Sequence, residues 1–189
     1  MVDGPRIFIG LGSNLGDETR QLLAAWNLLG AVPGISLIAL SNPYRSAPVG
    51  MASDNWFTNA VGEIRADMSP SRLLRHLLSI ETTMGRRRDP EKSGYQDRAL
   101  DLDLLYYGDL RLATASLRLP HPQRRQRLFV LEPLAEIAHD FIDCEAMRTV
   151  ATLLADLRRS ESALPEQRRQ RLLAATWPAA PSCFFPSAS

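Results

Sequence analysis

The spacing of hydrophobic residues along the chain predicts four strands and two helices in the order β-α-β-β-α-β. Short apolar runs of strand length lie at residues 6–11, 35–40, 57–64 and 99–107. Apolar residues at helical spacing follow Asp17, up to residue 32, and follow Ser69, up to residue 84. Two further helices are expected at residues 128–138 and 147–158.

Polar stretches rich in proline and glycine predict where these elements stop. Residues 41–55, 86–97 and 120–127 are expected to be loops, and residues 110–120 a short hairpin. Ser69 is a suitable N-cap with Pro70 at the first helical position, and Gly85 is a suitable stop.

The composition changes near residue 160, which divides the chain into two parts. Residues 1–159 are expected to form one domain. Residues 160–189 are rich in Ala, Pro and Ser, and they predict a partly disordered appendage with a possible short helix at 166–175.

The element order favours one fold class. It is that of an α+β ferredoxin-like sandwich, with a mostly antiparallel sheet and helices packed on it. Helices on one face would leave the other face for loops and substrate.

The composition limits which cellular compartment and which classes of binding partner are expected. The chain is 45% hydrophobic and 23% charged with a net charge of +1, which gives no overall field for nucleic acid or a membrane surface. Two cysteines without metal spacing fit a reducing compartment. The sequence starts without a signal-peptide pattern and lacks an apolar run of membrane-spanning length, so we expect a cytoplasmic protein.

The most unusual local pattern is a pair of aspartates in an apolar strand. Asp101 and Asp103 are two residues apart, so strand geometry places both carboxylates on one face, about 6–7 Å apart. One interpretation is a half-buried strand with a solvated face. The other is a divalent-metal site, where a cation offsets the repulsion between the carboxylates.

Arginines on both sides of this strand favour a phosphate ligand. Arg86, Arg87 and Arg88 lie in the preceding loop with Arg98 directly before the strand, and a later loop holds His121 and Arg127. A polyphosphate held by magnesium suits such a set, although arginine runs are often only solvated. Asn59, in the middle of a strand beside Phe57, indicates either hydrogen bonding to a planar polar ligand or an exposed edge position.

Seven motifs in order then show a resemblance to a known family. They are GSNLGD at 12–17, YRSAPVG at 44–50, FTNAV at 57–61, IE at 80–81, GRRR at 85–88, RALDLDLL at 98–105 and LPHP followed by RLFVLEPLAEIA within 119–138. Over residues 7–157 the chain resembles the 6-hydroxymethyl-7,8-dihydropterin pyrophosphokinases of folate biosynthesis. These enzymes move pyrophosphate from ATP to the pterin hydroxymethyl group and release AMP.

The resemblance implies a role for each matching residue. Asp101 and Asp103 would bind two magnesium ions, and Arg86 and Arg88 would join them as catalytic residues. ATP would be held by Glu81, Arg86, Arg88, Arg98, His121 and Arg127. The pterin would contact Ser46, Ala47, Val49, Phe57, Asn59, Tyr95 and Phe129. The protein is expected to be a monomer that acts on these two small molecules.

Three positions depart from the family pattern. Asp97 stands where proline is frequent, Tyr95 where some members carry tryptophan, and Pro122 where some carry tyrosine. They bear on affinity and loop behaviour more than on reaction type. Two other readings are an RNA-binding α+β module, which the low net charge disfavours, and a paralogue that binds without transfer.

Overall fold

The computed structural model describes residues 4–48, 55–85 and 97–178. Its elements, in chain order, are β1 (Ile7–Ser13), α1 (Glu18–Gly30), β2 (Ile35–Leu40), β3 (Tyr44–Ser46), β4 (Phe57–Ala66), α2 (Pro70–Thr83), β5 (Asp101–Tyr107), β6 (Leu112–Ala113), β7 (Arg118–Leu119), the 3-10 turn η1 (Arg124–Gln126), α3 (Leu128–Ala138), β8 (Ile142–Asp143), β9 (Arg148–Thr149), α4 (Val150–Ser162), the 3-10 turn η2 (Glu166–Arg168) and β10 (Leu172–Ala174).

The main sheet is antiparallel and has the predicted ferredoxin-like core. The four predicted strands are β1, β2, β4 and β5, and they lie in the order β2-β4-β1-β5. The helix starts are also as predicted, because Asp17 accepts a hydrogen bond from the Arg20 N–H and Ser69 from the Arg72 N–H. Gly85, with φ +89°, follows α2 as its stop.

Four of the described strands were not predicted: β3, β8, β9 and β10, with β9 at the start of the expected helix 147–158. β3 lies within the expected loop 41–55 and pairs with the first half of β4, while β2 pairs with the second half. β10 pairs with β3, so the expected helix at 166–175 was wrong: this stretch holds η2 and then a strand. Residues 112–119 do form a hairpin, but β6 and β7 pair with each other rather than with the main sheet.

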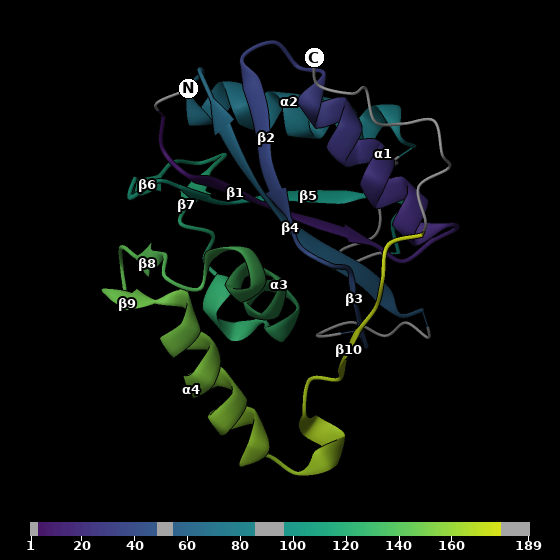
Figure 1. The fold of residues 1–189 in the computed structure, drawn as a ribbon, viewed down its shortest axis with the longest axis vertical. Helices are drawn as coiled ribbons and strands as arrows, with labels where there is room; N and C mark the ends of the chain where they lie inside the picture. Colours follow the sequence, from purple (N-terminus) through teal and green to yellow (C-terminus); the bar gives the residue numbers. More distant parts are fainter. Residues whose placement is uncertain (1–3, 49–54, 86–96, 179–189) are drawn as a thin grey trace, which may run out of the picture.

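Helices cover both faces of the sheet, which corrects the expectation of one helical face. Figure 1 shows α1 and α2 above the sheet and α3 and α4 below it. The upper core contains Ile7, Ile9, Leu102 and Leu104 from the strands. The lower core packs Phe8, Leu105 and Tyr106 against α3 and α4. Part of the lower face lies beyond the start of α3, and the site described below is built there.

A β-bulge in β5 lets that strand contribute side chains both to the lower core and to the site. Phe8 pairs with Tyr106 and Ile9 with Leu104, so Leu105 is the extra residue. Asp101, Asp103, Leu105 and Tyr106 consequently face the lower side, while Leu102 and Leu104 face the upper core.

A buried ion pair fixes the η1 turn to the lower core. Arg124 and Asp143 are both fully buried, with the Arg124 Nε and the Asp143 Oδ2 2.7 Å apart. The Tyr106 hydroxyl donates to the same carboxylate oxygen, at 2.8 Å. Arg124 also donates to Glu145 and to the backbone carbonyl of His121. The η1 turn, which lies between His121 and Arg127, is therefore held by charges rather than by apolar packing alone.

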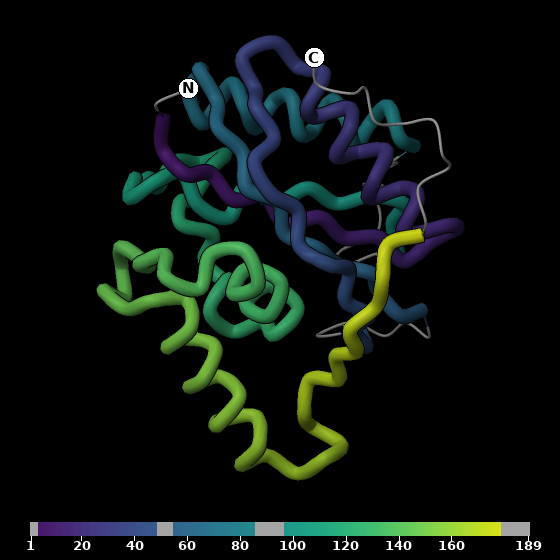
Figure 2. The backbone as a smooth tube through the Cα atoms, viewed as in Figure 1, coloured from purple at the N-terminus to yellow at the C-terminus, as the bar shows by residue number. Residues whose placement is uncertain are grey.

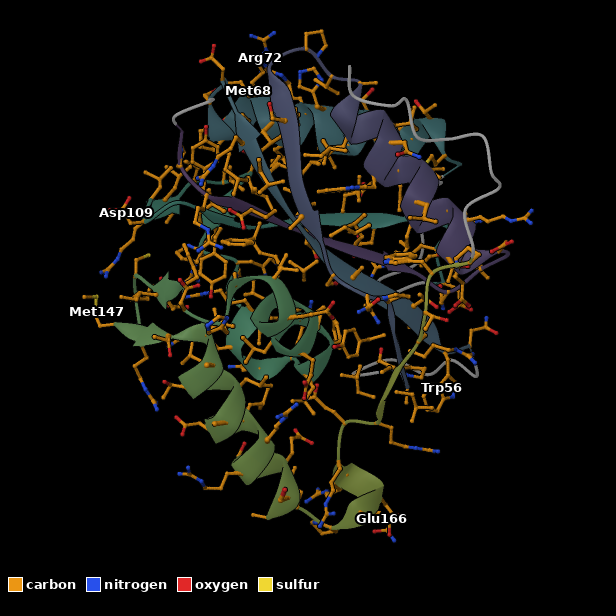
Figure 3. All side chains as sticks on the ribbon, in the orientation of Figure 1. Trp56, Met68, Arg72, Asp109, Met147 and Glu166 are labelled. Carbon is orange, nitrogen blue, oxygen red and sulfur yellow. The ribbon has the colours of Figure 1, made fainter. Side chains whose placement is uncertain are left out.

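The chain after α4 runs back along the sheet edge. Figure 2 shows this segment passing from the end of α4 up beside β3. The guanidinium of Arg171 lies 5.1 Å from the ring centroid of Trp56, which is labelled in Figure 3, and that of Arg45 lies 5.8 Å from it. The Trp177 indole donates to the Ser41 carbonyl at 3.0 Å. Among the described residues, no helix is long and apolar enough to cross a membrane.

Candidate active site

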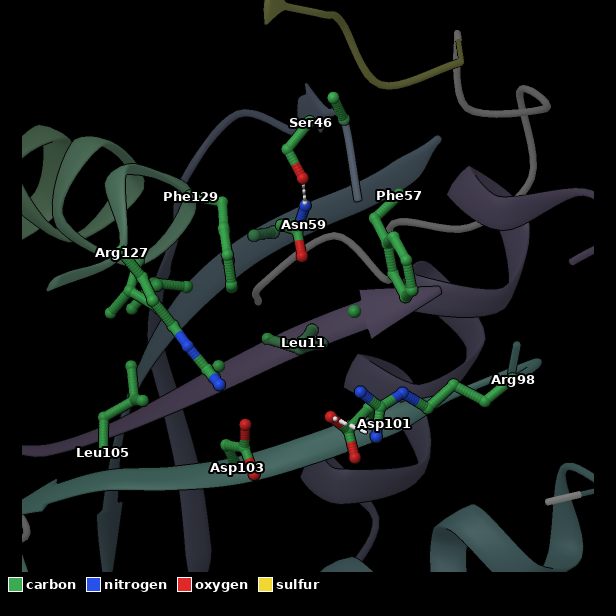
Figure 4. Close-up of a pocket in the computed structure, with 16 residues that line it drawn as sticks. Leu11, Ser46, Phe57, Asn59, Arg98, Asp101, Asp103, Leu105, Arg127 and Phe129 are labelled. Atoms are coloured by element: carbon green, nitrogen blue, oxygen red, sulfur yellow. Dashed lines mark hydrogen bonds and ion pairs between the residues drawn. The ribbon is translucent and has the colours of Figure 1, made fainter. Parts of the chain in front are cut away.

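A cavity on the lower face brings together residues from five separate segments. Its floor comes from β1, β4 and β5, and its rim from the end of β3 and the start of α3 (Figure 4). The residues that line it are Gly10, Leu11, Gly12, Ser46, Ala47, Phe57, Asn59, Ala60, Val61, Arg98, Asp101, Asp103, Leu105, Arg127, Phe129 and Val130.

The two aspartates form the acidic end of this cavity. Asp101 pairs with Gly12 of β1, and Asp103 pairs with Gly10. Each carboxylate therefore lies beside a glycine, which has no side chain to occupy that part of the cavity. Burial first, and then the negative charge of Asp101, raise the pKa of Asp103 to about 6, although Arg127 and Arg98 act in the opposite direction. The ligand-free protein therefore disfavours the charged form of Asp103.

Arg98 meets the aspartates from the start of β5. Its Nη1 lies 3.1 Å from the Asp101 Oδ2. The buried Asn14, at the end of β1, fixes the Arg98 backbone: its side-chain oxygen accepts from the Arg98 N–H at 2.8 Å, and its own N–H donates to the Arg98 carbonyl at 3.2 Å. The Asp97 carboxylate accepts hydrogen bonds from Asn14 and Asn55. The aspartate at this position, where the family frequently has proline, therefore connects the segments next to β1, β4 and β5.

The other end of the cavity is planar and aromatic. Asn59 is buried, and its Nδ2 donates to the Ser46 hydroxyl at 3.0 Å. Figure 4 shows the Asn59 oxygen directed into the cavity, with Phe57 and Phe129 on either side. Gly12 leaves the space for this amide, since a Cβ at residue 12 would lie 3.3 Å from the Asn59 Oδ1. An acceptor between two rings suits a flat ligand with N–H groups.

Arg127 enters the cavity from the start of α3. In Figure 4 its guanidinium points toward Asp103 and Leu11. The same guanidinium lies 5.3 Å from the Phe129 ring centroid, and it donates a hydrogen bond to the Gln123 side chain. Together with Arg98, it places positive charge on two sides of the aspartates.

His121 lies near this group but does not line the cavity. Burial first, and then the positive charge of Arg127, lower its pKa to about 4, so the imidazole is neutral at pH 7. Its Nδ1 accepts from the Gln123 N–H at 3.3 Å, which assigns the ring hydrogen to Nε2. His121 can therefore donate one hydrogen bond without carrying charge.

Glu81 is also absent from the cavity lining. It is buried in α2, and its Oε1 accepts a hydrogen bond of 2.7 Å from the backbone N–H of Leu102, between the two aspartates. It therefore holds β5 against α2, and its contact with a nucleotide stays a prediction.

The structure thus brings most of the predicted residues to one cavity. Those that line it are Ser46, Ala47, Phe57, Asn59, Arg98, Asp101, Asp103, Arg127 and Phe129. Val49, Arg86, Arg88 and Tyr95 lie outside the described residues.

Sequence reasoning did not single out Gly10, Gly12 or Asn14 for the site. The signal for the glycines was their spacing: two glycines two apart in a buried strand mark a face where something other than a side chain must fit.

The donor set fits a magnesium ion that shares its coordination with a substrate. Within residues 4–48, 55–85 and 97–178, no three or more His, Cys, Asp or Glu side chains gather in a way that could hold a metal. Two neighbouring carboxylates do gather, and magnesium is typically held by one or two carboxylates together with phosphate oxygens and water.

Comparison with known families decides the class of protein. The model of the 7,8-dihydro-6-hydroxymethylpterin-pyrophosphokinase (HPPK) family matches residues 8–139. The chain belongs to the HPPK family. The matched range spans the elements from β1 to the end of α3, which contribute every residue that lines the cavity.

Curated relatives agree with this assignment. The chain is 42% identical to an HPPK, the 2-amino-4-hydroxy-6-hydroxymethyldihydropteridine pyrophosphokinase of Methylorubrum extorquens, over 72% of this chain and 85% of the relative. It is 38% identical to the Pseudomonas aeruginosa enzyme of the same name, over 71% of this chain and 82% of the relative. The HPPK family thus identifies this protein as an ATP-dependent pyrophosphokinase.

Solved structures support the fold. A bifunctional HPPK-DHPS crystallised with substrates aligns with a TM-score of 0.68 and 12% identity, over 83% of this chain and 44% of that chain. The HPPK-DHPS of Plasmodium falciparum with pterin and p-hydroxybenzoate gives a TM-score of 0.65 and 13% identity, over 86% and 45%. This chain spans less than half of those fusion proteins, so the similarity concerns the HPPK fold alone. It confirms the predicted ferredoxin-like class.

Proposed function

We propose that this protein transfers the pyrophosphoryl group of ATP to the hydroxymethyl group of 6-hydroxymethyl-7,8-dihydropterin, in a magnesium-dependent reaction that releases AMP. The observation that carries the proposal is one cavity with two complementary ends. Asn59 between Phe57 and Phe129 suits a flat heterocycle, and Asp101 and Asp103 between Arg98 and Arg127 suit a polyphosphate.

Each end has a distinct chemical task. The Asn59 oxygen would accept hydrogen bonds from the pterin N–H groups, and the two phenyl rings would stack against its faces. The Ser46 hydroxyl holds the Asn59 amide in that orientation. Ala47 lines the same end, and its backbone carbonyl would contact the pterin. These contacts would fix the hydroxymethyl group toward the aspartates.

At the other end, Asp101 and Asp103 would hold two magnesium ions. When bound, the ions would neutralise phosphate charge and polarise the reacting oxygens. Arg98 and Arg127 would neutralise non-bridging phosphate oxygens, and His121 would donate a hydrogen bond to the nucleotide. The proposed contributions of Arg86 and Arg88 to ATP binding and catalysis, of Glu81 to ATP binding, and of Val49 and Tyr95 to pterin binding complete the set.

The reaction would be an in-line attack. The pterin hydroxyl oxygen bonds to the β-phosphorus, the bond from that phosphorus to the α–β bridging oxygen breaks, and AMP leaves. Asp101 is the candidate acceptor for the hydroxyl proton. Most of the rate enhancement would come from positioning and charge, because phosphoryl transfer needs little covalent help. The protein would act as a monomer.

Release of AMP from ATP tests this function directly. We expect AMP to form only when 6-hydroxymethyl-7,8-dihydropterin and magnesium are both present, with chelation of magnesium as the control. If AMP did not depend on the pterin, the proposal would be wrong.

A further inference from the structure

The segment after α4 contains a glutamine that contacts both peptide groups next to Arg127. The Gln170 Nε2 donates to the Gln126 carbonyl at 2.9 Å, and the Gln170 Oε1 accepts from the Leu128 N–H at 2.9 Å. These two groups belong to the peptides on either side of Arg127. One side chain, more than forty residues away in sequence, therefore fixes the backbone of a cavity arginine.

Gln170 is itself held by α4. The Glu161 Oε1 accepts from the Gln170 Nε2 at 2.9 Å, and the Glu161 Oε2 accepts from the Gln170 backbone N–H at 2.6 Å. Both amide hydrogens of the Gln170 side chain thus meet oxygen acceptors, which assigns the orientation of the amide. The orientation is the one that leaves the Gln170 oxygen for Leu128.

This contact supplies a hydrogen-bond acceptor at the start of α3. Arg127 is the N-cap residue of α3, and its side chain makes no capping hydrogen bond. The first N–H groups of a helix lack intrahelical partners, and a side chain of the N-cap residue usually supplies one. The Arg127 guanidinium carries donors only and cannot accept from an N–H group, so Gln170 supplies the acceptor for the Leu128 N–H. The Arg127 side chain points into the cavity.

The same segment also holds the opposite rim. The Ala47 N–H donates to the Arg171 carbonyl at 3.0 Å, and β10 then pairs with β3. Ala47 and Arg127 both line the cavity. Residues 170–174 therefore connect the rim expected to hold the pterin with the arginine expected to hold phosphate.

We propose that Gln170 is a positioning residue for Arg127, which fixes the peptide groups on both sides of this arginine so that its guanidinium meets the nucleotide phosphates. The inference rests on the proposed function for the role of Arg127. Gln170 touches neither substrate and acts only through the arginine backbone.

A double-mutant cycle with Arg127 tests this role. The measurement is calorimetric affinity for a non-hydrolysable ATP analogue with magnesium, in the full-length protein. We expect Gln170→Ala to weaken binding about five- to tenfold, the size of effect typical of losing such hydrogen bonds. In an Arg127→Ala background, the same change should cost less than about twofold, because the residue through which it acts is gone. Gln167→Ala, at an exposed glutamine of the same segment, is the matched control.

Two outcomes would overturn the proposal. One is an equal loss of affinity in both backgrounds, which would mean that Gln170 acts by a route other than Arg127. The other is an unchanged affinity in the Gln170→Ala protein. Failure of the proposed function would look different, since unaltered protein would then release no pterin-dependent AMP, whatever the outcome of the cycle.

Hydrogen exchange gives a readout that needs no ligand. Gln170→Ala should speed exchange of the Leu128 amide hydrogen, which loses its acceptor. Gln170→Glu keeps an acceptor and should preserve protection at Leu128, although it loses the donor to Gln126 and adds a charge beside Glu161. Protection of Leu128 that is the same in the unaltered and Gln170→Ala proteins would contradict the proposed contact.

Discussion

Asp103 shows how far the demands of folding and of a proposed catalytic role can differ at one residue. A desolvated carboxylate beside a second carboxylate costs free energy in the ligand-free protein, which is why its pKa is raised to about 6. For an acid, this direction means that the charged form is disfavoured in the folded state and that this penalty is present above that pH. A cation beside the carboxylate would offset this penalty, and the proposed magnesium ions are such cations.

Asp103→Asn separates these two demands. We expect pterin-dependent AMP formation to fall by more than the roughly 10–100-fold typical of changes behind a metal ligand, because a ligand itself is lost. The thermal midpoint at pH 8 should be no lower than that of the unaltered protein, since a desolvated charge has been removed. The two measurements are a steady-state assay and a thermal scan. Retention of a near-normal rate would remove Asp103 from the metal site.

In the lower core, the opposite charges of Arg124 and Asp143 are both buried and pair with each other. We expect Arg124→Met to lower the free energy of unfolding by about 3–5 kcal/mol, because it leaves the Asp143 carboxylate buried without its cation. Urea unfolding at pH 7 measures this. The double variant Arg124→Met/Asp143→Leu should recover most of the loss, since replacing a whole buried pair by apolar residues is often neutral.

The same ion pair makes the folding stability depend on pH. Backbone and Tyr106 hydrogen bonds, with the Arg124 charge, hold the pKa of Asp143 below its ordinary value against the effect of burial. The stabilisation is therefore present above the unfolded pKa near 4 and is lost as the pH falls through the folded value. The double variant should lose less stability than the unaltered protein when the pH is lowered from 4 to 2. Parallel curves would show that other carboxylates dominate.

At the scale of elements, the upper layer depends on close approach of a helix to the sheet. Trp26 of α1 lies directly over Gly62 of β4, where a Cβ would be 2.2 Å from the indole ring. Nothing in the sequence near Trp26 or Gly62 signals this contact. The position of α1 on the sheet is therefore set by one missing side chain, and β4 must keep that glycine although glycine weakens a strand.

Gly62→Ala should consequently be destabilising. We expect a loss of about 1–3 kcal/mol, the usual cost of overpacking, because the indole cannot move away without shifting α1. Chemical denaturation measures it, with Gly4→Ala as a control, since a Cβ there has its nearest neighbour at 3.9 Å. Combining Gly62→Ala with Trp26→Leu should restore part of the loss. No effect of Gly62→Ala would mean that α1 can shift at little cost.

For the molecule as a whole, the parts predicted from sequence are those that local pattern controls. β1, β2, β4, β5 and the first two helices follow from hydrophobic period and caps, and the site residues on β4 and β5 follow from motif position. A possible short helix was expected at 166–175, but the pairing of β10 with β3 overrides the helix preference of Leu, Ala and Arg there. Gln170 could not be found in sequence, because nothing near it signals a contact with residues 126 and 128.

The position of Gln170 in the chain also has a consequence for synthesis. Residues 170–174 are made after all the other strands of the main sheet and after Arg127. Domains generally fold as units, and synthesis proceeds at about 5–20 residues per second. The proposed hold on the Arg127 backbone can therefore form only once the last strand of the main sheet has been made, so full nucleotide affinity should require synthesis through residue 174.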